Sequence, residues 1–208
     1  MKRKPFLTTA RVVQIFDEML AYRRGFCADN EFVRMHEVWE ELCVEGSDWK
    51  IRKYRDKKTE NFKPKAGVVQ FGHSVTLSVD ERLFQDAAKG GGLSNYILAH
   101  ELGHIALDHH ASSKVVKNFQ LFSGPGGMSI RPPTLEEEEV DYAAVFFQCG
   151  QALFDKRLDA VQLARKAFTD VSVVRKAQKI VGLEVFQREL LFQRQLTLLR
   201  PKYERVIL

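Results

Sequence analysis

Two histidines and a glutamate near the middle of the chain have the spacing of a zinc-binding helix. In His100-Glu101-Leu102-Gly103-His104 the histidines are four residues apart, and on a helix such residues share one face about one turn apart. Both imidazoles can therefore bind one Zn²⁺ ion at about 2.0–2.1 Å. Glu101 lies roughly 100° round the helix, where its carboxylate reaches a water on that ion. We expect Glu101 to be the general base of a hydrolytic reaction.

The residues around this motif favour a buried helix. Residues 96–99, 102 and 105–107 are apolar on nearly every side of it. Histidine and glutamate without partners would be costly in such a helix, so a metal ion gives them a reason to be there. Gly103 costs about 1 kcal/mol relative to alanine in mid-helix, which predicts that another element approaches closely at this point.

A catalytic zinc ion needs a third protein ligand and one open position. His110 is the tenth residue after His100, as in the pattern HExxHxxGxxH, but Leu107 stands where that pattern has its glycine. His109 and His110 are instead expected to interact with the C-terminal helix dipole. The other source of a ligand is the acidic stretch from Glu136 to Asp141 on the next expected helix. The run 136–139 also reads as a solvated first turn.

At this point the sequence resembles the ImmA/IrrE-type metallopeptidases, a gluzincin-like family of single-domain enzymes of bacteria and mobile elements. The family has HELGH and then, some tens of residues later, E-x-x-A-x-x-F on a helix. The best register here is Asp141-x-x-Ala144-x-x-Phe147, with aspartate in place of the glutamate. The resemblance covers about residues 30 to 185. It implies Asp141 as the third zinc ligand, with Glu138 as the fallback.

The resemblance also implies a function. Members of the family cut, or promote the loss of, helix-turn-helix repressors, often after DNA damage or in anti-phage circuits. We therefore expect a zinc endopeptidase of the bacterial cytoplasm, with one Zn²⁺ per chain and a helix-turn-helix repressor as its partner. The strand expected at 75–79 is the natural edge on which an extended substrate could pair.

The remaining pattern predicts the elements that position this site. Apolar spacing predicts a helix capped by Thr8 or Thr9 and ending near Gly25, and a second one from Asn30 to Gly46. Three glycines at 90–92 form a joint, after which Ser94 caps the motif helix as far as about His110. Further helices are expected at 135–153 and 158–199, with a break at Gly182.

Together these elements indicate an α+β, zincin-like fold. It is mostly helical, with a small sheet beside the motif helix and a helical C-terminal tail. We expect a metallopeptidase domain at 1–155 and a helical extension at 156–208.

Several single residues carry weaker signals. His73, just before the expected strand, and Tyr142, on the acidic helix, are candidates for stabilising an oxyanion. Either also fits an ordinary structural role. A thiolate of Cys27, Cys43 or Cys149 could cap the zinc and hold the enzyme inactive, but the favoured interpretation of all three is that they are small buried apolar residues.

The charge is unevenly distributed along the chain. There are 32 basic and 27 acidic residues, a net charge of +5. A basic stretch with interleaved aromatic residues could follow the phosphates of single-stranded DNA, which would then activate the enzyme. A solvated hairpin is the plainer interpretation. The candidate contacts are Lys50, Arg52, Lys53, Arg55, Lys57 and Lys58.

Composition limits the other classes of protein. The chain has 208 residues, of which 45% are apolar and 28% charged, so it can bury a core and is not disordered. No secretory signal or membrane span is expected, and three scattered cysteines suit a reducing cytosol. A DNA-binding regulator, with a helix-turn-helix between Leu158 and Gly182, and a pseudoprotease with a structural zinc remain alternatives. Glu101 distinguishes an enzyme from these alternatives, because a structural zinc site does not need its carboxylate.

Overall fold

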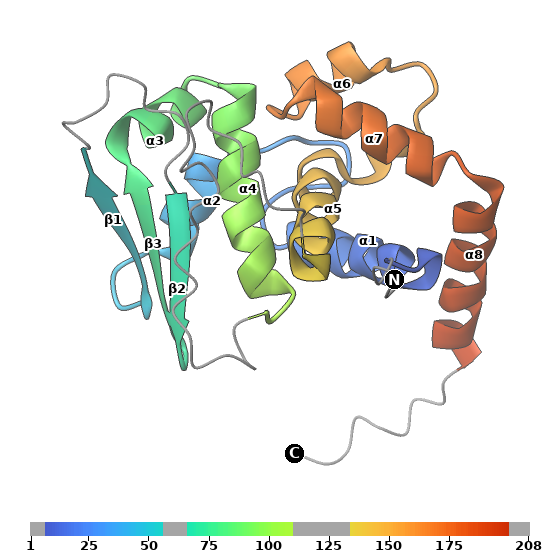
Figure 1. Cartoon of the computed structure of the whole chain (residues 1–208), viewed down its shortest axis with the longest axis horizontal. Coiled ribbons are helices and arrows are strands. Elements are labelled where there is room, and N and C mark those ends of the chain that lie inside the picture. Colours follow the sequence, from blue (N-terminus) through green and yellow to red (C-terminus); the bar gives the residue numbers. More distant parts are fainter. Residues whose placement is uncertain (1–6, 56–65, 110–133, 200–208) are drawn as a thin grey trace, which may run out of the picture.

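The computed structural model describes residues 7–55, 66–109 and 134–199, and in them the chain is mostly helical with one small sheet (Figure 1). The expected α+β class is confirmed. The helices are α1 (Thr9–Arg23), α2 (Met35–Leu42), α3 (Glu81–Ala88), α4 (Gly92–Ala106), α5 (Leu135–Cys149), α6 (Ala160–Lys166), α7 (Val171–Val181) and α8 (Glu184–Leu199), with a 3-10 turn η1 (Gly150–Phe154). The strands are β1 (Trp49–Tyr54), β2 (Ala66–Phe71) and β3 (Ser74–Asp80).

The sheet has the order β1-β3-β2, with β1 parallel and β2 antiparallel to β3. Leu77, fully buried in the middle of β3, lies opposite Ile51 on one side and Val68 on the other. The expectation that residues 75–79 offer an edge to a substrate is therefore wrong, because β3 is paired along both of its sides. The edge strands are β1 and β2, and β2 is the one that packs beside α4 (Figure 1).

The helices form a second layer, in which α4 lies between the sheet and α5. The three helices α2, α3 and α4 contact the sheet, α5 packs against α4, and α1 packs against α5 (Figure 1). As a result α4 is enclosed on both sides, and its polar side chains face protein rather than water. Among the described helices, none combines the length and the apolar character that crossing a membrane requires.

Some predicted helix ends are confirmed and others need correction. The hydroxyl of Thr8 caps α1 as expected, accepting from the N–H of Arg11. The second helix begins at Met35 rather than after Asn30, because the Glu37 carboxylate accepts from the N–H of Arg34, 3.2 Å away, and closes the first turn there.

The motif helix begins two residues before the expected Ser94 cap and ends at Ala106 instead of His110. The hydroxyl of Ser94 donates to the Asp86 carboxylate of α3 rather than to its own helix. A Cβ on Gly92 would come within 2.6 Å of the carbonyl oxygen of Thr169, so a glycine is needed where α4 starts against that backbone.

The C-terminal helices share one core with the rest of the chain. The ring of Phe16 on α1 lies 5.1 Å from that of Phe146, 5.5 Å from that of Phe154 and 6.0 Å from that of Phe186 on α8. The predicted domain boundary at 155/156 falls between η1 and α6, and buried side chains on both sides of it meet in this cluster. The predicted break at Gly182 is confirmed, since this residue ends α7.

A buried arginine holds the end of α5 in place. Arg23 is fully buried and donates to the carbonyl oxygens of Phe147, at 2.7 Å, and Gln148, at 3.3 Å, in the last turn of that helix, and also to the carbonyl of Glu31. A cation at this position satisfies carbonyls that the helix leaves unpaired and opposes the negative end of the helix dipole. Arg23 thereby joins α1, the following loop and α5.

Replacing Arg23 with methionine should lower the free energy of unfolding by about 3 kcal/mol, because the apolar chain keeps the volume but leaves buried carbonyls without donors. Denaturant titration measures the change. The control is Arg24→Met, since Arg24 is exposed and its ion pair with Asp29 should contribute no more than about 0.5 kcal/mol. Equal midpoints for the two variants would contradict this role.

Candidate metal centre

The two motif histidines meet on the face of α4 that is turned toward α5. His100 is 4% and His104 1% exposed, and the centroids of their rings are 5.0 Å apart. The structure thus brings the rings together as their spacing predicts. Burial of two polar rings is unfavourable unless they have partners, and α5 provides these.

Gly103 allows α4 and α5 to come close enough for this. A Cβ at position 103 would lie 3.0 Å from Cγ1 of Val140 and 3.2 Å from Cβ of Ala143. The close approach predicted from this glycine is confirmed. Because Gly103 lies between the two histidines in sequence, this close contact between the helices also places acidic residues of α5 opposite the rings.

Glu137, in the first turn of α5, completes a group of three candidate ligands. One of its carboxylate oxygens is 3.1 Å from Nε2 of His100 and the other 3.9 Å from Nε2 of His104. One ligand atom from each residue lies within 4.8 Å of the others. Ligands of a tetrahedral zinc ion are about 3.3 Å apart when each bond is about 2.0–2.1 Å. The group therefore has the donor types and nearly the spacing of a His₂Glu zinc site.

Asp141 and Glu138, the ligands expected from the sequence, do not join this group. Asp141 lies one turn beyond Glu137, and its Oδ1 is 3.4 Å from Nδ1 of His100, on the other edge of the ring from Nε2. Glu138 is turned about 100° away from Glu137 and lines a cavity with residues of α1 and α7 instead. Glu137 and Asp141 share one helix face, and the longer side chain, that of Glu137, lies within 4 Å of both Nε2 atoms.

Asp141 instead orients His100. Its Oδ1 accepts from the hydroxyl of Tyr96, 2.6 Å away, and faces Nδ1 of His100. Metal-binding histidines commonly donate their second ring N–H to a carboxylate in this way. Burial and the charge of Asp141 raise the pKa of Tyr96, so its hydroxyl stays a donor. Sequence reasoning missed Tyr96 as a site residue, although it precedes His100 by one helical turn.

The charges of the site match a cation. Burial by itself would lower the pKa of His100, but hydrogen bonds with Asp141 and Glu137 and the charge of Glu101 raise it to about 9. Burial raises the pKa of Glu101 to about 7; His100 opposes this rise and Glu137 adds to it. Three carboxylates thus hold a proton on His100. A dication would satisfy the same negative charge, so these residues fit a metal ion.

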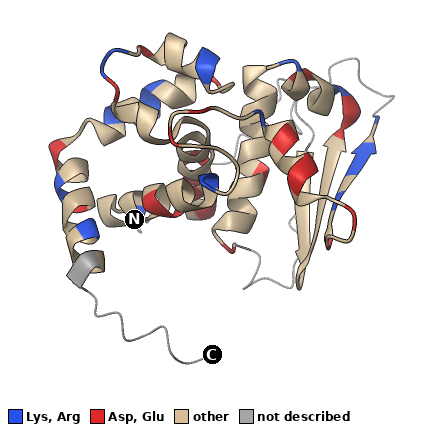
Figure 2. Cartoon of the chain, turned by 180° about the vertical axis from the view of Figure 1, so that it is seen from behind, with Lys and Arg blue, Asp and Glu red and all other residues tan. Residues whose placement is uncertain are grey.

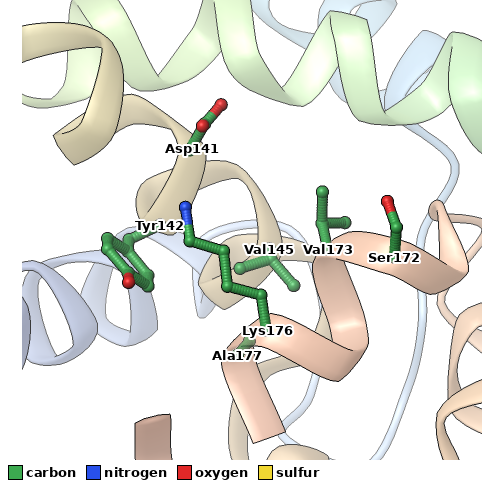
Figure 3. Close-up of a pocket in the computed structure, with 7 residues that line it drawn as sticks. All are labelled: Asp141, Tyr142, Val145, Ser172, Val173, Lys176 and Ala177. Carbon is green, nitrogen blue, oxygen red and sulfur yellow. The ribbon is translucent and has the colours of Figure 1, made fainter. Parts of the chain in front are cut away.

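Tyr142 faces a different part of the molecule. It lines a cavity of about 290 Å³ between α5 and α7, where Nζ of Lys176 lies 4.9 Å from the centre of its ring (Figure 3). The ring also stacks on Phe146 at 5.7 Å and points away from Asp141. This placement gives no support to the oxyanion role expected of Tyr142.

His73 is also remote from the group. It is exposed in the turn between β2 and β3, past the end of β2, which lies three positions or about 10 Å beyond Val68. Val68 is the strand residue whose backbone approaches Glu101. This position gives no support to the oxyanion role expected of His73.

The thiols lie elsewhere, and the last histidine is not described. In the described part of the chain, the candidate ligand group contains no cysteine. Cys27 follows α1, Cys43 ends α2, and Cys149 is buried about 18 Å along α5 from Glu137. A capping thiolate is thus not in place. His110 lies outside the described residues.

The basic residues form a separate feature on the outer strand. Lys50, Arg52, Lys53 and Arg55 are exposed on and just after β1, and Figure 2 shows Lys and Arg side by side along this strand. Lys53 lies over the ring of Phe84, with Nζ 4.2 Å from its centre. Lys57 and Lys58 lie outside the described residues. Because β1 and β2 are opposite edges of the sheet, these charges are on the side away from α4.

No protein-family model, curated protein or solved structure matches the chain.

If Glu137 is the third ligand, Glu137→Gln should weaken zinc binding by at least about 100-fold, since a neutral amide replaces an anionic donor. Asp141→Asn, which alters an orienting group, should cost about 10-fold or slightly more. Competition with a chromophoric chelator measures both.

Glu138→Gln is the matched control, because it removes the same charge from the same turn of α5 without touching the histidines. Its zinc affinity should equal that of the unaltered protein. A larger loss in Asp141→Asn than in Glu137→Gln would restore Asp141 as the ligand.

Proposed function

We propose that this protein is a zinc-dependent endopeptidase of the zincin type, akin to the ImmA/IrrE metallopeptidases that its sequence resembles. His100, His104 and Glu137 would hold the ion, one per chain. Glu101 would act as general base and then as general acid. The site opens on the side of α5, where the side chains of Glu137 and Asp141 are 23% and 37% exposed.

The observation that carries this proposal is the position of Glu101. It is fully buried, and neither of its carboxylate oxygens makes a hydrogen bond of normal geometry within the described residues. The N–H of Val68 is near enough to lower its pKa but is not in such a bond. Burying an unsatisfied carboxylate is costly, and a structural metal site would gain nothing from it. A base that must reach a water explains the cost.

The chemistry assigned to the chain is hydrolysis of a peptide bond. Zinc in such a site supplies Lewis-acid chemistry, polarising a carbonyl oxygen and lowering the pKa of water. Glu101 takes a proton from the attacking water as its oxygen bonds to the carbonyl carbon. The same carboxyl group then delivers that proton to the departing nitrogen as the C–N bond breaks. Asp141 and Tyr96 keep the ring of His100 in one orientation during both steps.

The edge of β2 is the surface on which an extended substrate would pair. The backbone N–H of Val68 is directed toward Glu101 and hence away from β3. Since backbone groups alternate along a strand, Gln70 presents its N–H to the same edge and Val69 donates toward β3. A peptide added to this edge would lie alongside α4 and its carboxylate.

The biological setting follows from the resemblance. We propose a helix-turn-helix repressor as the protein substrate, in the bacterial cytoplasm, with single-stranded DNA on β1 as an activator. Nucleic acid at β1 and substrate at β2 would not compete for one surface. A DNA-binding regulator and a pseudoprotease that sequesters its partner are the competing functions.

Glu101→Gln should lower cleavage of a helix-turn-helix partner by about 10²- to 10⁴-fold while zinc content stays unchanged, because only proton transfer is removed. The zinc-loaded protein is incubated with a candidate helix-turn-helix repressor, with and without single-stranded DNA. Gel electrophoresis and mass spectrometry of the fragments measure the cut.

Glu138→Gln serves again as the control and should cleave normally. Binding of the partner without fragments from the unaltered protein would favour the pseudoprotease, and equal cleavage by Glu101→Gln would remove Glu101 from the mechanism.

Gln70→Pro should reduce cleavage at least about 10-fold with little change in stability, since an edge strand tolerates proline where its N–H faces outward. Val69→Pro removes an N–H that donates within the sheet and should instead lower the melting temperature. Activity and thermal unfolding of both variants distinguish the two effects. Full activity of a folded Gln70→Pro protein would contradict substrate pairing on β2.

A further inference from the structure

His104 contacts His109 through its second ring nitrogen, and His109 is connected in turn to side chains of α5 and α1. Its Nδ1 lies 3.4 Å from Nδ1 of His109, and Nε2 of His109 lies 3.2 Å from Oε2 of Glu139 on α5. Both oxygens of Glu139 accept from Arg11 on α1, from Nε at 3.0 Å and Nη2 at 2.7 Å. These contacts form a continuous chain from a candidate ligand to the N-terminal helix.

The end of α4 is shaped to place His109 there. The N–H of Asp108 donates to the carbonyl of Ile105, and the N–H of His109 to that of His104, 3.1 Å away. This pair of bonds is a Schellman motif, which needs its middle residue in the left-handed conformation. Asp108 adopts it, with φ of 56°. The turn sends His109 back over the last turn of the helix, and its ring centre lies 5.6 Å from that of His104.

The chain allows only one arrangement of protons if His104 is to bind a metal through Nε2. That nitrogen must carry a lone pair, so Nδ1 of His104 carries the proton and donates. Nδ1 of His109 must then accept, and its Nε2–H donates to Glu139. Burial would raise the pKa of Glu139, but hydrogen bonds from Arg11 and His109 hold it below its usual value, so the carboxylate remains an acceptor.

We propose that His109, Glu139 and Arg11 are positioning residues that fix the tautomer and the orientation of His104, and so set the affinity of the site for its metal. The inference rests on the proposed metal centre and concerns its second histidine. His100 is oriented by one carboxylate directly, whereas His104 reaches its carboxylate through another imidazole. Side-chain exposures of 10% for His109 and 17% for Glu139 shield this path from water.

Two amide substitutions at His109 separate the proposed role from simple packing. In His109→Asn the amide oxygen occupies the place of Nδ1 and can still accept from His104. In His109→Gln the amide occupies the place of Nε2, so the contact with Glu139 survives and the acceptor for His104 is lost. We expect zinc affinity to fall about 10- to 100-fold in His109→Gln and less than about 3-fold in His109→Asn.

Zinc affinity is measured by chelator competition, with the visible spectrum of the Co²⁺-substituted protein as a second readout and thermal unfolding as the check on folding. Arg11→Met should show a smaller loss than His109→Gln, since Glu139 then loses its anchor but not its charge. Equal affinities for the two His109 variants, or a greater loss in His109→Asn, would overturn the relay while leaving the metal centre intact. Failure of the unaltered protein to bind zinc would overturn both, and none of these outcomes depends on peptide cleavage.

Discussion

The contact between α4 and α5 at Gly103 is the constraint on which the rest of the site depends. With no side chain at this position, Val140 and Ala143 approach the backbone of α4 directly. A larger residue would push the two helices apart. Protein interiors are so densely packed that even a small shift of this kind lowers stability. Glu137 and Asp141, the carboxylates of α5 that face the two histidines, approach them across this contact.

The surrounding elements act mainly by holding α5 still. Its last turn is anchored by Arg23, its first turns carry Glu137 and Glu139, and α1 contributes to both ends through Arg23 and Arg11. The sheet has a different role, because it places the backbone of Val68 next to Glu101. The candidate ligands, the candidate base and the proposed substrate edge therefore lie on α4, α5 and β2, each of which is placed by its own set of contacts.

Sequence patterns were informative where the chemistry is local. The spacing of His100 and His104, the Thr8 cap and the break at Gly182 depend on neighbours within one or two turns, and the structure agrees with them. The third candidate ligand depends on how α5 is rotated against α4, and the acidic run offers carboxylates on every side of that helix. The sequence did not indicate β2, because its place beside β3 arises from strand pairing. It did not indicate the contact of His109 with Glu139 either, because this contact depends on the turn conformation at Asp108.

The ion pair between Arg11 and Glu139 joins residues 128 positions apart. Contacts of such long sequence separation form only after much of the chain has collapsed, because the entropy of closing a long loop must be overcome first. During synthesis α1 leaves the ribosome well before α5, so the complete set of groups around His104 assembles only once α5 has been made. A nascent chain that has reached HELGH but not α5 therefore lacks the carboxylates that face the two histidines.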